Sequence, residues 1–314
     1  MKKISTYIPS LILSVLLVFI FIGGSALIIA DLNINSKRFV SLAEKKGLNS
    51  KIYSELEKHY QEKYHSTGIP ADVYMNSLTN DYLDSVIDAY FNAAFESLDS
   101  GKKFDSETII PKNESLEKNI DVFFNDFAES SGYWDTKDNE EYEKKLNNYE
   151  KLISNTKKSA YKTIGNNCDV YKFSAMNKHG ILSKISKLYR HRILLTGLLI
   201  GFTALIITLL FIINRKDKKS ISYWCGVSFL ISGIIGSVPT LYLICTKYYD
   251  AFSVKQPQIF TAYTSLMYSL TEAFMASHIA FIVIGISMII IYAVIRGKDK
   301  ALTKSGNIKD IKKQ

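Results

Sequence analysis

Residues 193–213 read "ILLTGLLIGFTALIITLLFII" and contain no charged side chain. A helix needs about 20 apolar residues to cross the hydrocarbon core of a bilayer, which is about 30 Å thick. Three further stretches of similar length also lack Asp, Glu, Lys and Arg, namely 8–30, 223–246 and 273–295. Because an open-ended segment satisfies its own backbone hydrogen bonds in lipid only as a helix, these stretches predict four transmembrane helices.

The first of these stretches follows a basic N-terminus, which is also how a signal peptide begins. The residues "GGSA" at 23–26 match a cleavage site, but the apolar run continues through "LIIA" to residue 30. That run is long for a signal peptide, so we predict an uncleaved anchor and keep cleavage after Ala26 as the alternative. Both readings export the segment that follows.

The basic residues at the ends of the predicted spans indicate their orientation. The segments 1–7, 215–222 and 296–314 together hold 13 Lys and Arg residues, whereas the short loop 247–272 holds two. Short loops rich in Lys and Arg remain in the cytoplasm. We therefore expect a multi-pass protein of the plasma membrane, with both termini cytoplasmic and residues 31–191 extracytoplasmic.

The net charge of +9 gives no sign of a nucleic-acid partner, because it is concentrated at the membrane flanks. Residues 31–191 contain 23 basic and 25 acidic side chains, which nearly cancel. The basic tail marks the topology and favours contact with anionic membrane lipids.

The exported segment has the periodicity of helices. In "NDYLDSVIDAYFNAAFESL", residues 80–98, apolar side chains recur at three- and four-residue steps, with Asn80 available as a cap. Similar patterns predict helices over 114–130 and 139–163 and another from about 170 towards the second span. The apolar faces expected on the helices over 114–130 and 139–163 include Phe123, Phe124, Phe127, Tyr142, Leu146 and Leu152.

The predicted fold is all-α: a four-helix transmembrane bundle plus a helical extracytoplasmic domain inserted between the first and second spans. The predicted segments are a cytoplasmic N-terminus (1–7), transmembrane helix 1 (8–30), the extracytoplasmic domain (31–191), transmembrane helix 2 (192–214), a cytoplasmic turn (215–222), transmembrane helix 3 (223–246), an outer loop and helix extension (247–271), transmembrane helix 4 (272–296) and a basic cytoplasmic tail (297–314). The cytoplasmic segments are too short to form a catalytic or nucleotide-binding domain.

The stretch "IPADVYMNSLTNDYLDSVIDAYFNAAFESLDSGK", residues 69–102, precedes three clustered spans. The third span of the chain contains a proline, Pro239. In this arrangement the chain resembles widespread bacterial four-span membrane proteins that carry a helical extracytoplasmic domain between spans one and two and whose function is unassigned. The resemblance implies a protein of the bacterial cell envelope and no particular chemistry.

The sequence contains no recognisable catalytic or metal-binding motif. A calcium loop starting at Asp135 would need Asp or Asn at its third position and Gly at its sixth, where Lys137 and Glu140 stand. His59 and His65 are six residues apart, which separates them by about 120° on a helix instead of placing them on one face as zinc pairs require. We therefore expect no enzymatic activity, no cofactor and no metal site.

Small side chains at four-residue spacing mark two of the spans. They are Gly197 and Gly201 in the second span, and Ser228, Ser232 and Gly236 in the third. Such spacing lets helices approach closely, so these residues are predicted to pack against another helix of this chain or of a second copy.

Polar side chains gather near the outer ends of the spans. Pro239 and His278 lie about 10 Å and about 8 Å below the outer boundary, since a helix rises 1.5 Å per residue. We expect His278 to stabilise the bundle through a hydrogen bond, with a carbonyl freed by Pro239 as the candidate acceptor. The alternative is an outer-leaflet polar pocket formed by Glu272, His278, Pro239, Thr240 and Thr196.

Two functions follow from this layout. The first is a non-catalytic binding protein, whose extracytoplasmic domain contacts a ligand or an unidentified envelope protein, or which forms a homo-oligomer. The alternative is a small-molecule, ion or lipid transporter or channel subunit, which would use the pocket near His278 and Pro239.

Overall fold

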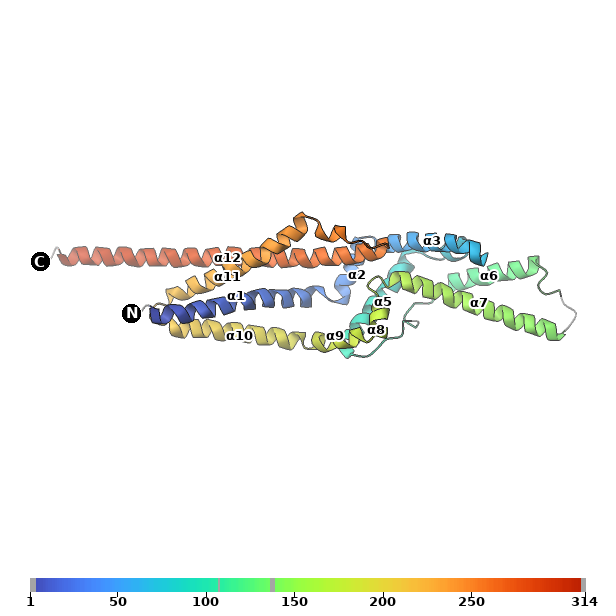
Figure 1. Ribbon diagram of the computed structural model, residues 1–314, viewed down its shortest axis with the longest axis horizontal. Coiled ribbons are helices and arrows are strands. Elements are labelled where there is room, and N and C mark those ends of the chain that lie inside the picture. The colour runs from blue at the N-terminus through green and yellow to red at the C-terminus, as the bar shows by residue number, and fades with distance from the viewer. Residues whose placement is uncertain (1–3, 107, 136–138, 312–314) are drawn as a thin grey trace. The chain divides into compact units, whose positions relative to one another are not determined.

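The computed structural model describes residues 4–106, 108–135 and 139–311 (Figure 1). These residues form helices and connecting turns and contain no strand, which confirms the all-α prediction for this part of the chain. The helices are α1 (Ile4–Asn33), α2 (Ser36–Lys45), α3 (Leu48–Thr67), α4 (Ala71–Met75), α5 (Asn80–Ser100), α6 (Glu114–Ser130), α7 (Asn139–Cys168), α8 (Phe173–Lys178), α9 (Ile181–Arg190), α10 (Arg192–Ile213), α11 (Lys219–Cys245), the 3-10 helix η1 (Tyr248–Ala251) and α12 (Pro257–Ile311).

The chain divides into two compact units. Unit 1 comprises Met1–Asn33, His191–Phe252 and Met267–Gln314, and unit 2 comprises Ile34–Arg190 and Ser253–Leu266. Residues 253–266, which were expected in the outer loop and helix extension, therefore belong to the same unit as the segment expected to be extracytoplasmic. The Tyr171 hydroxyl donates to the carbonyl of Ala262 at 2.9 Å, and Lys51 Nζ donates to Thr261 Oγ1 at 2.7 Å.

Four helical stretches are long and apolar enough to cross a membrane. They are Thr6–Asn33, Ile181–Ile213, Lys219–Cys245 and Pro257–Lys298. In unit 1, α1 lies between α10 and α11 (Figure 1). The outward faces of these helices are apolar; on α10 they include Ile193, Leu198 and Phe202, all more than half exposed. An apolar surface of this extent is expected where the surroundings are lipid.

Polar side chains join α1 to its neighbours inside unit 1. The hydroxyls of Ser14 and Ser228 lie 2.7 Å apart, and Ser228 Oγ also donates to the carbonyl of Ser14 at 2.9 Å. One turn away, Asn214 Nδ2 donates to Ser10 Oγ at 2.9 Å. The fully buried Leu17 packs beside this polar seam. Contacts of this kind help to determine which helices pair. In a membrane this matters because apolar side chains gain little free energy by leaving lipid for another helix.

The core of unit 2 is built on α5. The apolar face predicted there is buried as expected, namely Leu83, Val86, Ile87, Tyr90, Phe91, Ala94, Phe95 and Leu98. The helix begins differently, because the side chain of Thr79 caps it by accepting from the Tyr82 N–H at 3.1 Å, whereas Asn80 was the expected cap. Thr, like Asn, is among the side chains preferred at this position.

The apolar faces predicted for α6 and α7 are buried only in part. Phe124 is buried, but Phe127 is 57% exposed, and Tyr142, Leu146 and Leu152 on α7 are exposed too. The predicted faces are apolar, but part of each is not covered by another helix, since the C-terminal end of α6 and the N-terminal end of α7 project beyond α3 (Figure 1).

Candidate functional site

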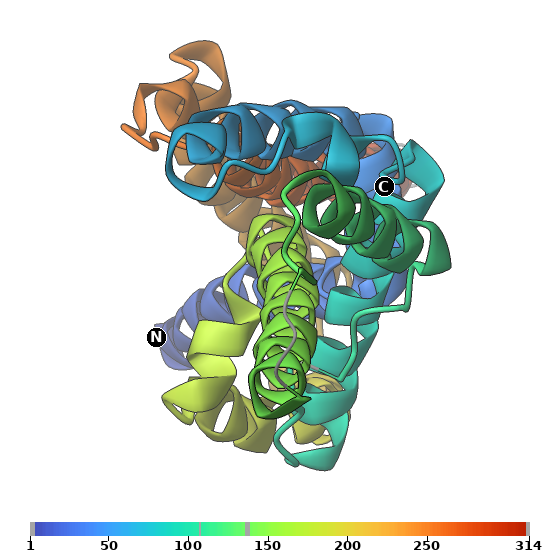
Figure 2. The same ribbon diagram turned by 90° about the vertical axis from the view of Figure 1, so that its right-hand side faces the viewer.

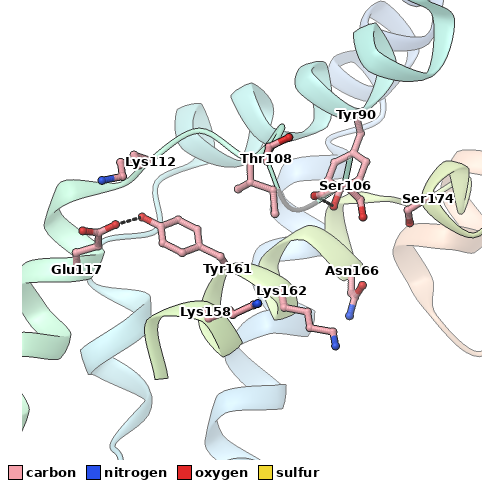
Figure 3. Close-up of a pocket in the computed structure, with 11 residues that line it drawn as sticks. Tyr90, Ser106, Thr108, Lys112, Glu117, Lys158, Tyr161, Lys162, Asn166 and Ser174 are labelled. Carbon is pink, nitrogen blue, oxygen red and sulfur yellow. Dashed lines mark hydrogen bonds between the residues drawn. The ribbon is translucent and has the colours of Figure 1, made fainter. Parts of the chain in front are cut away.

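Unit 2 contains a solvent-open cavity of about 520 Å³ (Figure 3). It lies between α7, the start of α8 and the segment 101–113 that connects α5 to α6. The lining residues are Tyr90, Ser106, Thr108, Ile110, Lys112, Glu117, Lys158, Tyr161, Lys162, Asn166 and Ser174. Its volume falls within the range of about 300–1,000 Å³ that is usual for small-molecule sites.

The α7 wall of the cavity follows from helical periodicity. Lys158, Lys162 and Asn166 are four residues apart, so they lie on one face of α7. The opposite wall is the segment 101–113, which contributes every second residue from Ser106 to Lys112.

A glycine allows the walls to meet closely. A Cβ added at Gly165 would lie 2.6 Å from both the Tyr90 hydroxyl oxygen and Ile110 Cδ1. A larger residue at this position would force the side chains of Tyr90 and Ile110, or α7 itself, to shift. Figure 2 shows α7, in yellow-green, lying among α3, α5 and α6, so this helix is the element around which the cavity is arranged.

Two tyrosines hold the connecting segment in place. The Tyr161 hydroxyl accepts from the Asn113 N–H at 2.9 Å and donates to Glu117 Oε1 at 3.0 Å. The Tyr90 hydroxyl donates to the carbonyl of Ser106 at 3.4 Å. Burial raises the pKa of both phenols, so each remains a neutral hydrogen-bond donor at physiological pH.

The charge around the cavity is positive. Three of the lining residues are lysines and one is a glutamate, whose Oε1 accepts the bond from Tyr161. Figure 3 shows Lys158 and Lys162 on the side of the cavity formed by α7, with Lys112 beside Glu117 at the other end.

An acid close to the cavity is already used in the fold. Asp169 is 2% exposed and accepts from the N–H groups of Phe173 and Ser174 at 2.7 Å and 2.9 Å, and from the Ser174 hydroxyl. These bonds satisfy the first donors of α8. The carboxylate of Asp169 is therefore held by donors of its own segment, and it orients Ser174.

A second, more polar cavity of about 330 Å³ lies elsewhere in unit 2 and includes Glu55, His59, Glu62 and Gln256. Partial burial lowers the pKa of His59, and the nearby Lys63 lowers it further. Within the described residues no three His, Cys, Asp or Glu side chains are grouped so that they could hold a metal ion.

In unit 1, His278 is fully buried against α11. A Cβ added at Gly236 would overlap its imidazole ring, so this glycine provides the space for the histidine. His278 Nδ1 is hydrogen-bonded to the carbonyl of Phe274 at 2.8 Å, within α12. The bond expected to a carbonyl freed by Pro239 is not the one formed, because Phe274 is already one helical turn away. Among the described residues, His278 Nε2 has no partner.

The other residues of the expected outer-leaflet pocket differ in their exposure. Thr240 is buried and its hydroxyl donates to the carbonyls of Gly236 and Ser237, each at 2.9 Å, while Pro239 and Glu272 are exposed. Thr196 lines a different small cavity of about 120 Å³ beside α1. A fully buried imidazole cannot line an open entrance, so His278 and Glu272 do not share one in this structure.

The residues expected to pack the helices fall into two groups. Ser228, Ser232 and Gly236 are buried on α11, whereas Gly197 and Gly201 face a shallow groove on α10 with no atom within 4 Å of an added Cβ. Contact between these two glycines and another chain stays a prediction.

Several packing residues were missed by sequence reasoning. At the crossing of α11 and α12, a Cβ added at Gly285 would lie 2.7 Å from the carbonyl oxygen of Gly226, and one at Gly233 would lie 2.7 Å from that of His278. Gly285 stands alone in its span and gives no spacing signal, whereas Gly226 and Gly233 share the third span with Gly236. Ser10 and Ser14 do give one, since they are small polar residues four positions apart in an apolar run.

The cavity of unit 2 was also missed. Its α7 row is visible in the sequence as Lys158, Lys162 and Asn166, but a solvated helix face has the same pattern. The segment 101–113 has no periodicity that would indicate which helix it covers.

Comparison of the chain with protein-family models, with curated proteins and with solved structures found no match. The resemblance to bacterial four-span membrane proteins therefore remains an expectation drawn from the layout of the sequence. The functional argument rests on the geometry of the chain itself.

Proposed function

We propose that the chain is a multi-span protein of a bacterial plasma membrane, with both termini cytoplasmic, in which unit 2 forms an extracytoplasmic binding domain. The domain binds a ligand or an envelope partner and does not catalyse a reaction. The four apolar helices of the chain anchor it.

The cavity in unit 2 carries this proposal. It is open to solvent and has a volume suited to a small molecule. Its lining includes no histidine, cysteine or aspartate, and Glu117 and the hydroxyls of Tyr90 and Tyr161 are held in hydrogen bonds within the walls. Binding accounts for these walls with fewer assumptions than catalysis does.

The packing of α1 supports retention of the first span as an anchor. Ser14 is buried against Ser228 and Trp224 of α11, and Leu17 has no exposed surface. Cleavage after Ala26 would remove these side chains from unit 1 and leave the polar groups of Ser228 without the contact to Ser14.

Site-specific photocrosslinking in intact cells tests the proposal. A photoreactive amino acid at Thr108, an exposed residue of the cavity, is compared with the same amino acid at Lys151, an exposed residue of α7 outside it. We expect a discrete adduct, identified by its mass, at position 108 and none at 151. Equal labelling at both positions, or none at 108, would contradict a binding domain that uses this cavity.

A further inference from the structure

The chemistry of the cavity walls identifies a class of ligand. Lys158 and Lys162 lie four residues apart on α7, and Lys112 contributes a third ammonium from the connecting segment. Like charges at this helical spacing repel one another, so an anion is favoured beside them and a cation is disfavoured.

Neutral hydrogen-bond donors lie in the same cavity as the ammonium groups. Ser106 contributes a hydroxyl and Asn166 an amide, whereas the hydroxyls of Thr108 and Ser174 already donate to the Asp105 carbonyl and to Asp169. Figure 3 shows Asn166 on the same side as Lys158 and Lys162. Donors beside lysines match the several acceptor oxygens of a carboxylate or a phosphate.

The cavity also has an apolar part. The rings of Tyr90 and Tyr161 and the side chain of Ile110 belong to its lining, and Gly165 allows two of them to approach α7. An inorganic ion would leave these surfaces unused, whereas an organic group would bury them. The site therefore combines an oxyanion end with a place for a ring or an alkyl group.

We infer that this cavity is a binding site for a small organic anion, a carboxylate or a phosphate monoester that bears an aromatic or apolar group. The inference rests on the proposed function and specifies its ligand. The ammonium groups of Lys158 and Lys162 neutralise the oxyanion, Ser106 and Asn166 donate to it, and the apolar residues hold the organic part.

Calorimetric titration of the full-length, detergent-purified protein tests this inference. The probes are phenyl phosphate, benzoate, inorganic phosphate and the neutral benzamide. We expect phenyl phosphate or benzoate to bind with one site per chain and more tightly than inorganic phosphate, and benzamide not to bind. A preference for phenyl phosphate identifies a phosphate monoester, and a preference for benzoate identifies a carboxylate.

Matched variants locate the binding. Lys162→Gln should weaken the affinity for the preferred probe by about tenfold, since a hydrogen bond to a charged group contributes about 1.5 kcal/mol or more. Lys151→Gln makes the same change of charge on α7 outside the cavity, so its affinity should equal that of the wild type. Thermal unfolding of both variants establishes that each is folded.

Three results would overturn the inference: no binding of either organic anion at about 10 mM, equal binding of benzamide, or equal weakening by Lys151→Gln and Lys162→Gln. If inorganic phosphate binds as tightly as the organic probes, the inference that the ligand bears an aromatic or apolar group is wrong. If the anions fail but the photoreactive residue at 108 still gives its adduct, the proposed function stands and only the ligand class is wrong.

Discussion

His278 shows how a polar side chain is accommodated in an apolar bundle. Its Nδ1 is bonded to the carbonyl of Phe274 in its own helix, and its ring lies 4.0 Å from the ring of Phe274 and 5.4 Å from that of Phe281, between centroids. The space for the ring comes from Gly236. Shape, rather than a hydrogen bond between helices, determines the fit of this residue.

We expect Gly236→Ala to lower the free energy of unfolding by about 2 kcal/mol, because the added methyl overlaps the imidazole of His278. Gly197→Ala is the matched control, since nothing lies within 4 Å of its added Cβ. Unfolding of the detergent-solubilised protein by sodium dodecyl sulfate measures both. In a His278→Ala background the cost of Gly236→Ala should fall below about 1 kcal/mol. Equal effects of Gly236→Ala and Gly197→Ala would show that the contact is not tight.

His59 should make unit 2 less stable in mild acid. Burial and the nearby positive charge of Lys63 lower the pKa of His59 from 6.5. The nearby Glu62 opposes this shift without cancelling it. As the pH falls through 6.5, the unfolded chain binds a proton that the folded chain does not, so the free energy of unfolding decreases. The effect is small, because much of the side chain remains in contact with water.

The comparison of wild type with His59→Gln at about pH 7.5 and about pH 5.5 isolates this contribution. Wild type should lose more stability on acidification than the variant does. Contributions that the two proteins share cancel from the difference. A loss of equal size in the two proteins would contradict a lowered pKa at His59.

At the scale of the element, α7 separates a core face from a cavity face. Ala160, Ile164 and Cys168 are buried and recur every four residues. The row of Lys158, Lys162 and Asn166 is offset from them by two residues, which is about 200° around a helix. One helix therefore closes the core with one side and presents the lysines with the other.

Gly165→Ala should destabilise unit 2 by about 1 kcal/mol. Alanine gains about 0.5–1 kcal/mol over glycine within a helix, but overpacking against Tyr90 and Ile110 costs about 1–3 kcal/mol. Thermal or denaturant unfolding measures the sum, with Gly201→Ala as the control without neighbours. A variant more stable than the wild type would mean that the connecting segment does not lie as close to α7 as the structure shows.

At the scale of the whole molecule, one unit of the chain has a surface suited to lipid and the other a surface suited to water. The described helices of unit 1 expose apolar side chains over most of α10, whereas α5 of unit 2 buries its own. A protein with both properties is stable only where lipid covers one unit and water the other. The basic residues at 215–222 and beyond 296 predict which side of the membrane each loop occupies.

Cysteine labelling tests that orientation. Cys245 is exposed, whereas Cys168 and Cys225 are buried, and burial raises the pKa of the Cys168 thiol, which makes it unreactive. A membrane-impermeant maleimide should therefore label intact cells at Cys245. In a Cys245→Ser background, Lys216→Cys should be labelled only after lysis. Labelling of Lys216→Cys in intact cells would reverse the proposed topology.

Some features were predictable from the sequence because they depend on neighbours along the chain. Four charge-free stretches long enough for a bilayer predicted the four candidate spans, and the three- and four-residue steps from Leu83 to Leu98 predicted the buried face of α5. The same rule did not indicate that Phe127 and Leu152 are exposed, because a helix pattern shows which face is apolar and not whether another helix covers it.

The sequence by itself determined that the chain is helical, that it has four apolar spans and where its basic flanks lie, since hydropathy, charge and periodicity are local properties. Only the tertiary structure decided that residues 253–266 join unit 2, that Gly236 accommodates His278, and that a segment without periodicity meets Gly165 and the lysines of α7 to form a cavity. These contacts join residues far apart in the chain, and their formation depends on close packing of complementary shapes, which no single segment encodes.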